Sequence, residues 1–121
     1  METPSIPAGF PDPALVINYA TALRLVRYRL HRLAHGQMKP WAAEHRFNYA
    51  RLVEIKKDDR QLYAPLIKRL LAAFGYSVEV LRLVSGPGVR NHFFVFPTAK
   101  AHALFCQELS TYDQLVLQAG Q

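Results

Sequence analysis

The chain has 121 residues, half of them apolar and 20% charged, which is typical of one folded domain and argues against a disordered protein. No apolar run reaches the ~18 residues that cross a bilayer, and residues 1–13 lack the basic and apolar stretches of a signal peptide. We therefore expect an intracellular, cytoplasmic protein without membrane contact, with a mature organellar matrix protein as the open alternative.

Positive charge is concentrated in the first third of the chain. The net charge is +6, and residues 13–46 hold six arginines and lysines against one acid, Glu44. Such an excess attracts polyanions, of which nucleic acid is the simplest. The single cysteine, Cys106, excludes a disulfide framework, and we expect it to be a buried packing thiol.

Residues 1–12 are rich in proline and predict an extended arm in front of one domain, residues 13–121. Apolar residues then recur every three or four positions, which predicts an amphipathic helix over residues 13–35 that ends at Gly36. Its apolar stripe is Leu15, Tyr19, Ala22, Val26, Leu30 and Leu33. Its other side carries Arg24, Arg27, His31 and His35.

The middle of the chain is expected to continue with a second helix that starts near Pro40 and whose end is open. Residues 50–57 alternate β-branched residues with others, which predicts a strand. The apolar spacing that follows predicts a helix over residues 60–74, unless that helix starts at Pro65.

Two segments rich in β-branched and aromatic residues, 76–84 and 89–96, flank the sequence SGPG and predict a hairpin. A four-residue turn pairs Val84 with Val89. In that register the core face carries Val78, Val80, Phe93 and Val95.

Pro97 is expected to end the second strand of the hairpin, and Thr98 to cap a helix that reaches about Leu109. Residues 111–118 alternate once more and predict a last strand, with a continued helix as the alternative.

From residue 50 onward the order is strand, helix, strand, strand, helix, strand, which is the ferredoxin-like plan. We therefore expect an α+β fold with a helical part, residues 13–49, and a ferredoxin-like part, residues 50–121. The sheet face away from the two helices carries Leu81, Leu83, Phe94 and Phe96, together with Arg90 and His92. An apolar face of this kind must be covered by the N-terminal helix, by a protein partner or by stacked bases.

The segment LLAAFGYSVEVLRLVSGPGVRNHFFVFPTAKAHALFCQEL, residues 70–109, resembles RNA recognition motif domains from their first helix to their second. In the third-strand octamer of that family, Arg90 matches the first position, Phe94 the fifth and Val95 the sixth. The remaining positions differ, and His92 stands where the first aromatic residue is usual. The resemblance implies the ferredoxin-like topology and RNA as the class of ligand.

The candidate nucleic-acid contacts are Arg24, Arg27, His31, Arg32, His35, Arg90 and His92, whose side chains can bind phosphates. The candidate platform for bases or for a protein partner is Leu81, Leu83, Phe94 and Phe96. The two histidines of the N-terminal helix lie four residues apart without a third metal ligand, and no nucleophile has a base and an acid at a suitable spacing. We expect no metal, no cofactor and no catalytic residue.

The sequence thus predicts a non-enzymatic RNA-binding protein, a small component or accessory factor of a ribonucleoprotein assembly that also has protein partners. Two alternatives stay open. One is a protein-interaction subunit of a multiprotein complex that uses the apolar sheet face. The other is a winged-helix-type DNA-binding protein that uses the helix over residues 60–74, with the hairpin as its wing.

Overall fold

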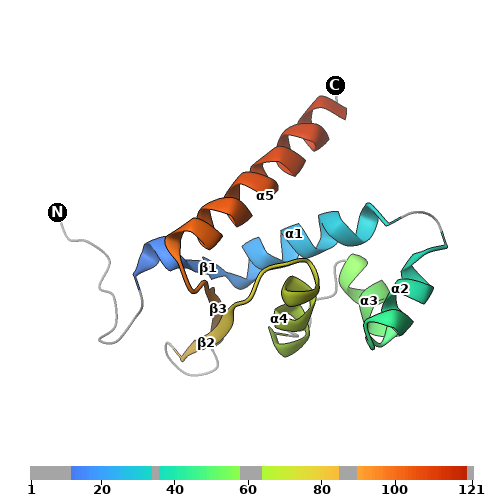
Figure 1. The fold of residues 1–121 in the computed structure, drawn as a ribbon, viewed down its shortest axis with the longest axis horizontal. Helices are drawn as coiled ribbons and strands as arrows, with labels where there is room; N and C mark the ends of the chain where they lie inside the picture. The colour runs from blue at the N-terminus through green and yellow to red at the C-terminus, as the bar shows by residue number, and fades with distance from the viewer. Residues whose placement is uncertain (1–11, 34–35, 58–63, 85–89, 120–121) are drawn as a thin grey trace.

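The computed structural model describes residues 12–33, 36–57, 64–84 and 90–119, and in these ranges the chain has an α+β fold (Figure 1). The elements are a 3-10 turn η1 (Pro13–Leu15), β1 (Val16–Asn18), α1 (Tyr19–His31), α2 (Met38–Glu44), α3 (Tyr49–Lys56), α4 (Ala64–Ala73), β2 (Glu79–Val84), β3 (Arg90–Val95) and α5 (Ala99–Ala119). In Figure 1 the sheet lies at one end, α2 and α3 lie at the other, and α1 runs between them. The predicted arm, residues 1–12, lies outside the described residues except for Asp12.

The sheet topology contradicts the predicted ferredoxin-like part. The three antiparallel strands are ordered β1-β3-β2, and four helices lie between β1 and the β2–β3 hairpin. The predicted order needs strands at residues 50–57 and 111–118, and both segments are helical. The prediction was wrong because short apolar runs fit a strand and one face of a helix equally well.

The helix predicted over residues 13–35 begins later than expected. Val16–Asn18 pairs with β3 as a short strand, and the Asn18 side chain then accepts a 2.8 Å hydrogen bond from the Thr21 amide, which caps α1. The apolar stripe predicted for this helix is confirmed at the buried positions Ala22, Val26 and Leu30.

Residues 50–57, predicted as a strand, belong to α3 and its C-cap. The Asn48 side chain caps this helix by accepting a 3.3 Å hydrogen bond from the Arg51 amide. Leu52 and Ile55, three positions apart, are buried together, which fits a helix and not a strand.

Prolines lie in the first turns of two helices. Pro40 is the third residue of α2, so the predicted start of the second helix is confirmed. The next helix, α4, starts at Ala64 with Pro65 as its second residue, close to the later of the two predicted starts. A first-turn amide has no partner within its helix, so proline is tolerated there.

The β2–β3 hairpin is confirmed, but its register differs by one residue from the predicted one. Val80 pairs with Phe94, where the sequence predicted Phe93 opposite Val80. A shift of one residue exchanges the two faces of a strand. Phe94 and Phe96 are accordingly buried, with 0% and 1% of their surface exposed, and Phe93 and Val95 are partly exposed. The SGPG turn itself lies outside the described residues.

The first strand explains which face of the hairpin is buried. Ile17 of β1 pairs with Phe94 on the central strand, and the Tyr19 ring at the start of α1 stacks on Phe94 with 6.3 Å between ring centroids. Helix α1 therefore covers the face that carries Phe94. The sequence left open whether the N-terminal helix, a protein partner or stacked bases cover this apolar face, and the structure shows the N-terminal helix over Phe94.

Helix α5 includes both the last predicted helix and the last predicted strand. Thr98 caps it as predicted, since its Oγ1 accepts a 3.1 Å hydrogen bond from the Ala101 amide, and the helix continues past Leu109. Phe105 and Leu109 are buried, but Cys106, about 100° further around the helix, is exposed. The expectation of a buried thiol was therefore wrong.

Within the described ranges, every helix is either too short or too polar to span a bilayer.

Candidate nucleic-acid interface

Two short helices, α2 and α3, are joined by a four-residue turn, residues 45–48. The chain reverses at Arg46, whose backbone has a φ of 61°, a left-handed conformation that favours glycine. The amide of the next residue, Phe47, donates a 2.7 Å hydrogen bond to the carbonyl oxygen of Ala42. This bond holds the end of the turn against α2.

Aromatic packing anchors the same turn to the core. The Phe47 side chain is buried, and the Trp41 ring stacks on it with 5.5 Å between ring centroids. On another side, Trp41 stacks on Phe74 at the same separation. Ala42 of α2 is fully buried, and its small side chain permits a close approach of the neighbouring helix. The angle between α2 and α3 is thus set by buried groups.

One side of α3 is directed away from the core. Leu52 and Ile55 are the buried residues of α3 and lie on the side that faces the core. At about 100° per residue, the opposite side of the helix and its C-cap carries Ala50, Val53, Glu54 and Lys57. We call these four residues the outer face of α3. Ala50 and Lys57 are exposed, and the other two are partly exposed.

The first turn of α3 adds two further side chains beside this face. Tyr49 has 42% of its surface exposed, and Arg51 is also exposed. Arg51 Nη1 lies 3.0 Å from Glu54 Oε2, so the single acid of the outer face is paired with a neighbouring guanidinium. The N-terminus of the helix also has a positive electrostatic potential, because its first amides have no partner within the helix.

Arg69 of α4 supports the turn from the other side. Its Nη2 donates a 3.0 Å hydrogen bond to the carbonyl oxygen of Arg46, and its Cζ lies 4.7 Å from the centre of the Phe47 ring. The exposed basic side chains of α2, the turn, α3 and α4 are Lys39, His45, Arg46, Arg51, Lys57 and Arg69. Glu44 is the exposed acid nearest to the turn in the sequence, and the group has an excess of positive charge.

The arginines predicted as phosphate contacts on α1 bind other parts of the chain. Arg24 forms a 3.2 Å ion pair with Asp113 of α5. Arg27 Nε donates a 2.7 Å hydrogen bond to a carbonyl oxygen near the end of α3. The guanidinium of Arg32 lies 5.2 Å from the centre of the Tyr112 ring. These contacts join α1 to α3 and α5, and Arg24 and Arg32 are still exposed to solvent.

The other predicted contacts do not come together in one site. His31 is exposed near the end of α1, and His35 lies outside the described residues. The His92 ring has an edge contact with the Tyr19 ring at 6.5 Å between centroids. The structure describes only the backbone of Arg90.

The predicted sheet-face platform is not a surface. Phe94 lies in the core against Tyr19 of α1, and Phe96 lies in the core against Phe105 of α5, so no base can stack on either ring. Leu81 is partly buried on the other face of β2, and only the backbone of Leu83 is described.

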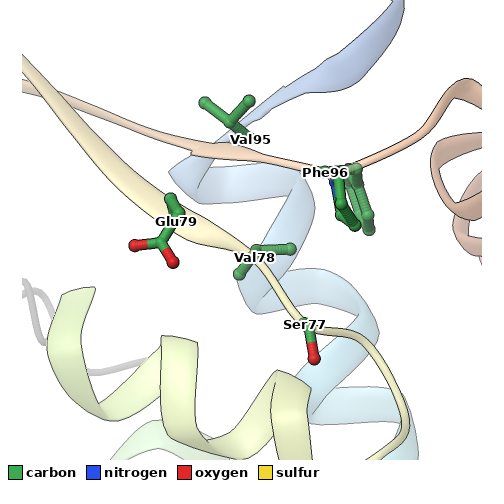
Figure 2. A pocket seen from close by; sticks show the side chains of 6 residues that line it. Ser77, Val78, Glu79, Val95 and Phe96 are labelled. Atoms are coloured by element: carbon green, nitrogen blue, oxygen red, sulfur yellow. The ribbon is translucent and has the colours of Figure 1, made fainter.

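A pocket at the edge of the sheet offers little chemistry (Figure 2). It is lined by Ser77, Val78, Glu79, Val95, Phe96 and Pro97. Its single ionisable group, the Glu79 carboxylate, lies 3.1 Å from the Lys68 ammonium of α4. Among the described residues, no three His, Cys, Asp or Glu side chains lie close enough together to hold a metal ion.

Sequence reasoning missed the outer face of α3 because it assigned residues 50–57 to a strand. Asn48, a favourable N-cap, followed by the three-residue spacing of Leu52 and Ile55, was the pattern that indicated a helix.

No protein-family model, curated protein or solved structure matches this chain.

Proposed function

We propose that the protein binds duplex DNA through α2 and α3, with the outer face of α3 directed into the major groove. The observation that carries this proposal is the pair of short helices joined by a four-residue turn with a left-handed residue, Arg46. Two helices joined in this way form the helix-turn-helix arrangement, whose second helix contacts base edges near its N-terminus. α3 is this second helix.

The residues on and beside the outer face suit such contacts. Ala50 and Val53 are small and apolar, as contact with a thymine methyl group requires. Arg51 and Tyr49 in the first turn have side chains that donate hydrogen bonds to base edges or phosphate oxygens. Lys57 lies at the other end of the same face, where an ammonium can contact the backbone of the duplex.

The charge around the turn supports attraction to phosphates. Lys39 of α2, Arg46 of the turn and Arg69 of α4 are exposed, and the chain carries a net charge of +6. Each phosphate that a lysine or arginine neutralises releases about one counterion. Binding should therefore weaken steeply as the salt concentration rises.

This proposal keeps the ligand of the winged-helix alternative but changes the helix that contacts it. Helix α4, which that alternative used, is buried along one side by Ala64, Ile67, Leu70 and Leu71. In Figure 1 the β2–β3 hairpin lies at the opposite end of the molecule from α3, and we assign it no contact with DNA. Stacking of bases or docking of a protein on Phe94 and Phe96 is not supported, since both rings are buried.

Fluorescence anisotropy with a labelled DNA duplex and an RNA duplex of the same sequence tests the proposal. The A-form major groove is too deep and narrow for side chains to contact bases, so we expect tighter binding to DNA. For a sequence without a specific site, we expect a Kd of roughly 1–100 µM at physiological salt. RNA binding as tight as DNA binding, or no DNA binding at ~50 mM salt, would contradict the proposal.

A further inference from the structure

The last turns of α5 expose three consecutive apolar side chains. Leu115, Val116 and Leu117 have 47%, 54% and 69% of their surfaces exposed. Consecutive residues lie about 100° apart around a helix, so these three side chains cover a little more than half of its circumference, and the exposed Gln114 and Gln118 lie on the rest. In Figure 1 this end of α5 runs away from the other elements. Three consecutive exposed apolar residues on a helix are unusual without a function.

Two rows of α5 lead into this end. Phe105, Leu109 and Tyr112 pack on the core, and Val116, four residues later, continues the same row where the core has ended. Leu104, which is 50% exposed, lies on another side of the helix. Leu115 follows it by three helical turns and lies on the same line. Gln107, Glu108 and Thr111 lie between Leu104 and Leu115 on this line, so the apolar surface is confined to the end of α5.

Beyond its first turn, α5 carries little charge, although the chain has a net charge of +6. From Ala103 to Gln118 the only residues that carry a formal charge are Glu108 and Asp113. Both acids are bound within the chain: Asp113 lies 3.2 Å from Arg24, and Glu108 lies 3.0 Å from Arg29. The surface left for a partner on this helix is neutral and apolar.

We infer that two copies of the chain associate through their α5 helices. A two-fold interface places the same residues of both copies against each other, so a charged face repels itself and a neutral face does not. A basic chain that recognised a different protein by charge would present arginines or lysines to it. A membrane surface likewise attracts helices rich in lysine and arginine, which α5 lacks from Ala101 to Gln118. A second copy is the occupant that fits this surface.

Sedimentation equilibrium without nucleic acid tests this inference independently of DNA binding. We expect the wild-type mass to rise with concentration from 13.8 kDa toward twice that value. The double variant Leu115→Glu/Leu117→Glu removes apolar surface and opposes like charges across the two-fold axis. Its dimer dissociation constant should rise at least tenfold. Both residues are exposed, so circular dichroism should show an unchanged helix content.

The matched control is Ala20→Glu/Ala43→Glu, which adds the same charge at exposed positions on α1 and α2. It should dimerise like the wild type. A wild-type chain that stays monomeric at ~200 µM, above the micromolar affinities common for weak complexes, would overturn the inference. So would an α5 variant that dimerises normally, or a control that dissociates as readily as the α5 variant.

Discussion

Arg69 Nη2 donates a 3.0 Å hydrogen bond to the carbonyl oxygen of Arg46, the left-handed residue of the turn between α2 and α3. The same guanidinium lies 4.7 Å from the centre of the Phe47 ring. One side chain of α4 therefore stabilises both the backbone and the aromatic anchor of the turn. The orientation of α3, and with it the proposed DNA contact, depends on this pair.

Replacing Arg69 should loosen the turn. We expect Arg69→Ala to lower the free energy of unfolding by about 1 kcal/mol, since a hydrogen bond and an exposed cation–π contact are both lost. Arg69→Lys should retain only part of this stabilisation, because an ammonium lacks the planar fork of the guanidinium. Urea denaturation measures the change, with Arg82→Ala on β2 as an exposed control. Equal losses in the two alanine variants would show that Arg69 does not stabilise the turn.

The left-handed backbone at Arg46 predicts an unusual response to glycine. Arg46→Gly should raise the free energy of unfolding by about 0.5–1 kcal/mol, because the strain of an L-residue at positive φ exceeds the entropy that glycine adds to the unfolded chain. Arg46→Val should lower the free energy of unfolding, since a β-branched residue is poorly tolerated at positive φ. Urea denaturation of both variants is the measurement. A glycine variant that is less stable than the wild type would refute the strained turn.

The register of the hairpin predicts which phenylalanine matters for stability. Phe94→Ala removes a fully buried ring and should cost about 3–5 kcal/mol, enough to unfold much of a marginally stable domain. Phe93→Ala, on the partly exposed face, should cost clearly less. Thermal denaturation followed by circular dichroism can compare the two. The reverse order would support the register that the sequence predicted.

Much of the fold could be predicted from local patterns, and the errors came from ambiguous ones. The stripe of α1, the hairpin and the Thr98 cap all rest on clear spacing or capping signals. Residues 50–57 were wrongly assigned to a strand because their alternation is short. The spacing of Leu52 and Ile55 fits one side of a helix as well. The two faces of β3 were exchanged in the prediction because the register depends on β1. This three-residue strand is not revealed by local sequence.

The candidate site was harder to predict than the fold, because charge does not distinguish a ligand contact from an internal one. Arg24 and Arg27 look like exposed cations on a helical pattern, yet their partners lie far away in the sequence, at Asp113 and near the end of α3. The outer face of α3 could not be proposed while its residues were assigned to a strand. Long-range pairing and the type of one short element therefore decided the site.

A partly buried cluster between α1, α5 and the segment that joins α4 to β2 predicts how stability depends on pH. Tyr76 donates a 2.5 Å hydrogen bond to Glu108, and burial together with this bond raises the pKa of Tyr76 above its ordinary value of 10.0. The unfolded chain loses this proton near pH 10, whereas the folded chain keeps it. Stability is therefore complete below about pH 10 and decreases as the pH rises further.

Replacing the hydroxyl group tests this dependence. Tyr76→Phe should make the free energy of unfolding decrease less steeply above about pH 10 than it does in the wild type. Urea denaturation at a series of pH values between about 8 and 11 gives the slopes. Tyr49→Phe, on exposed α3, is the control and should keep the wild-type slope. Identical slopes for wild type and Tyr76→Phe would show that this hydroxyl does not contribute.

The proposed DNA contact is tested most directly by one charge reversal and its matched control. Lys57→Glu changes the outer face of α3, and Lys100→Glu makes the same change at an exposed position in the first turn of α5. We predict that Lys57→Glu weakens binding to duplex DNA at least tenfold at ~100 mM salt and reduces the salt slope by about 1, whereas Lys100→Glu has little effect. Equal losses in the two variants, or no loss with Lys57→Glu, would contradict DNA binding through α3.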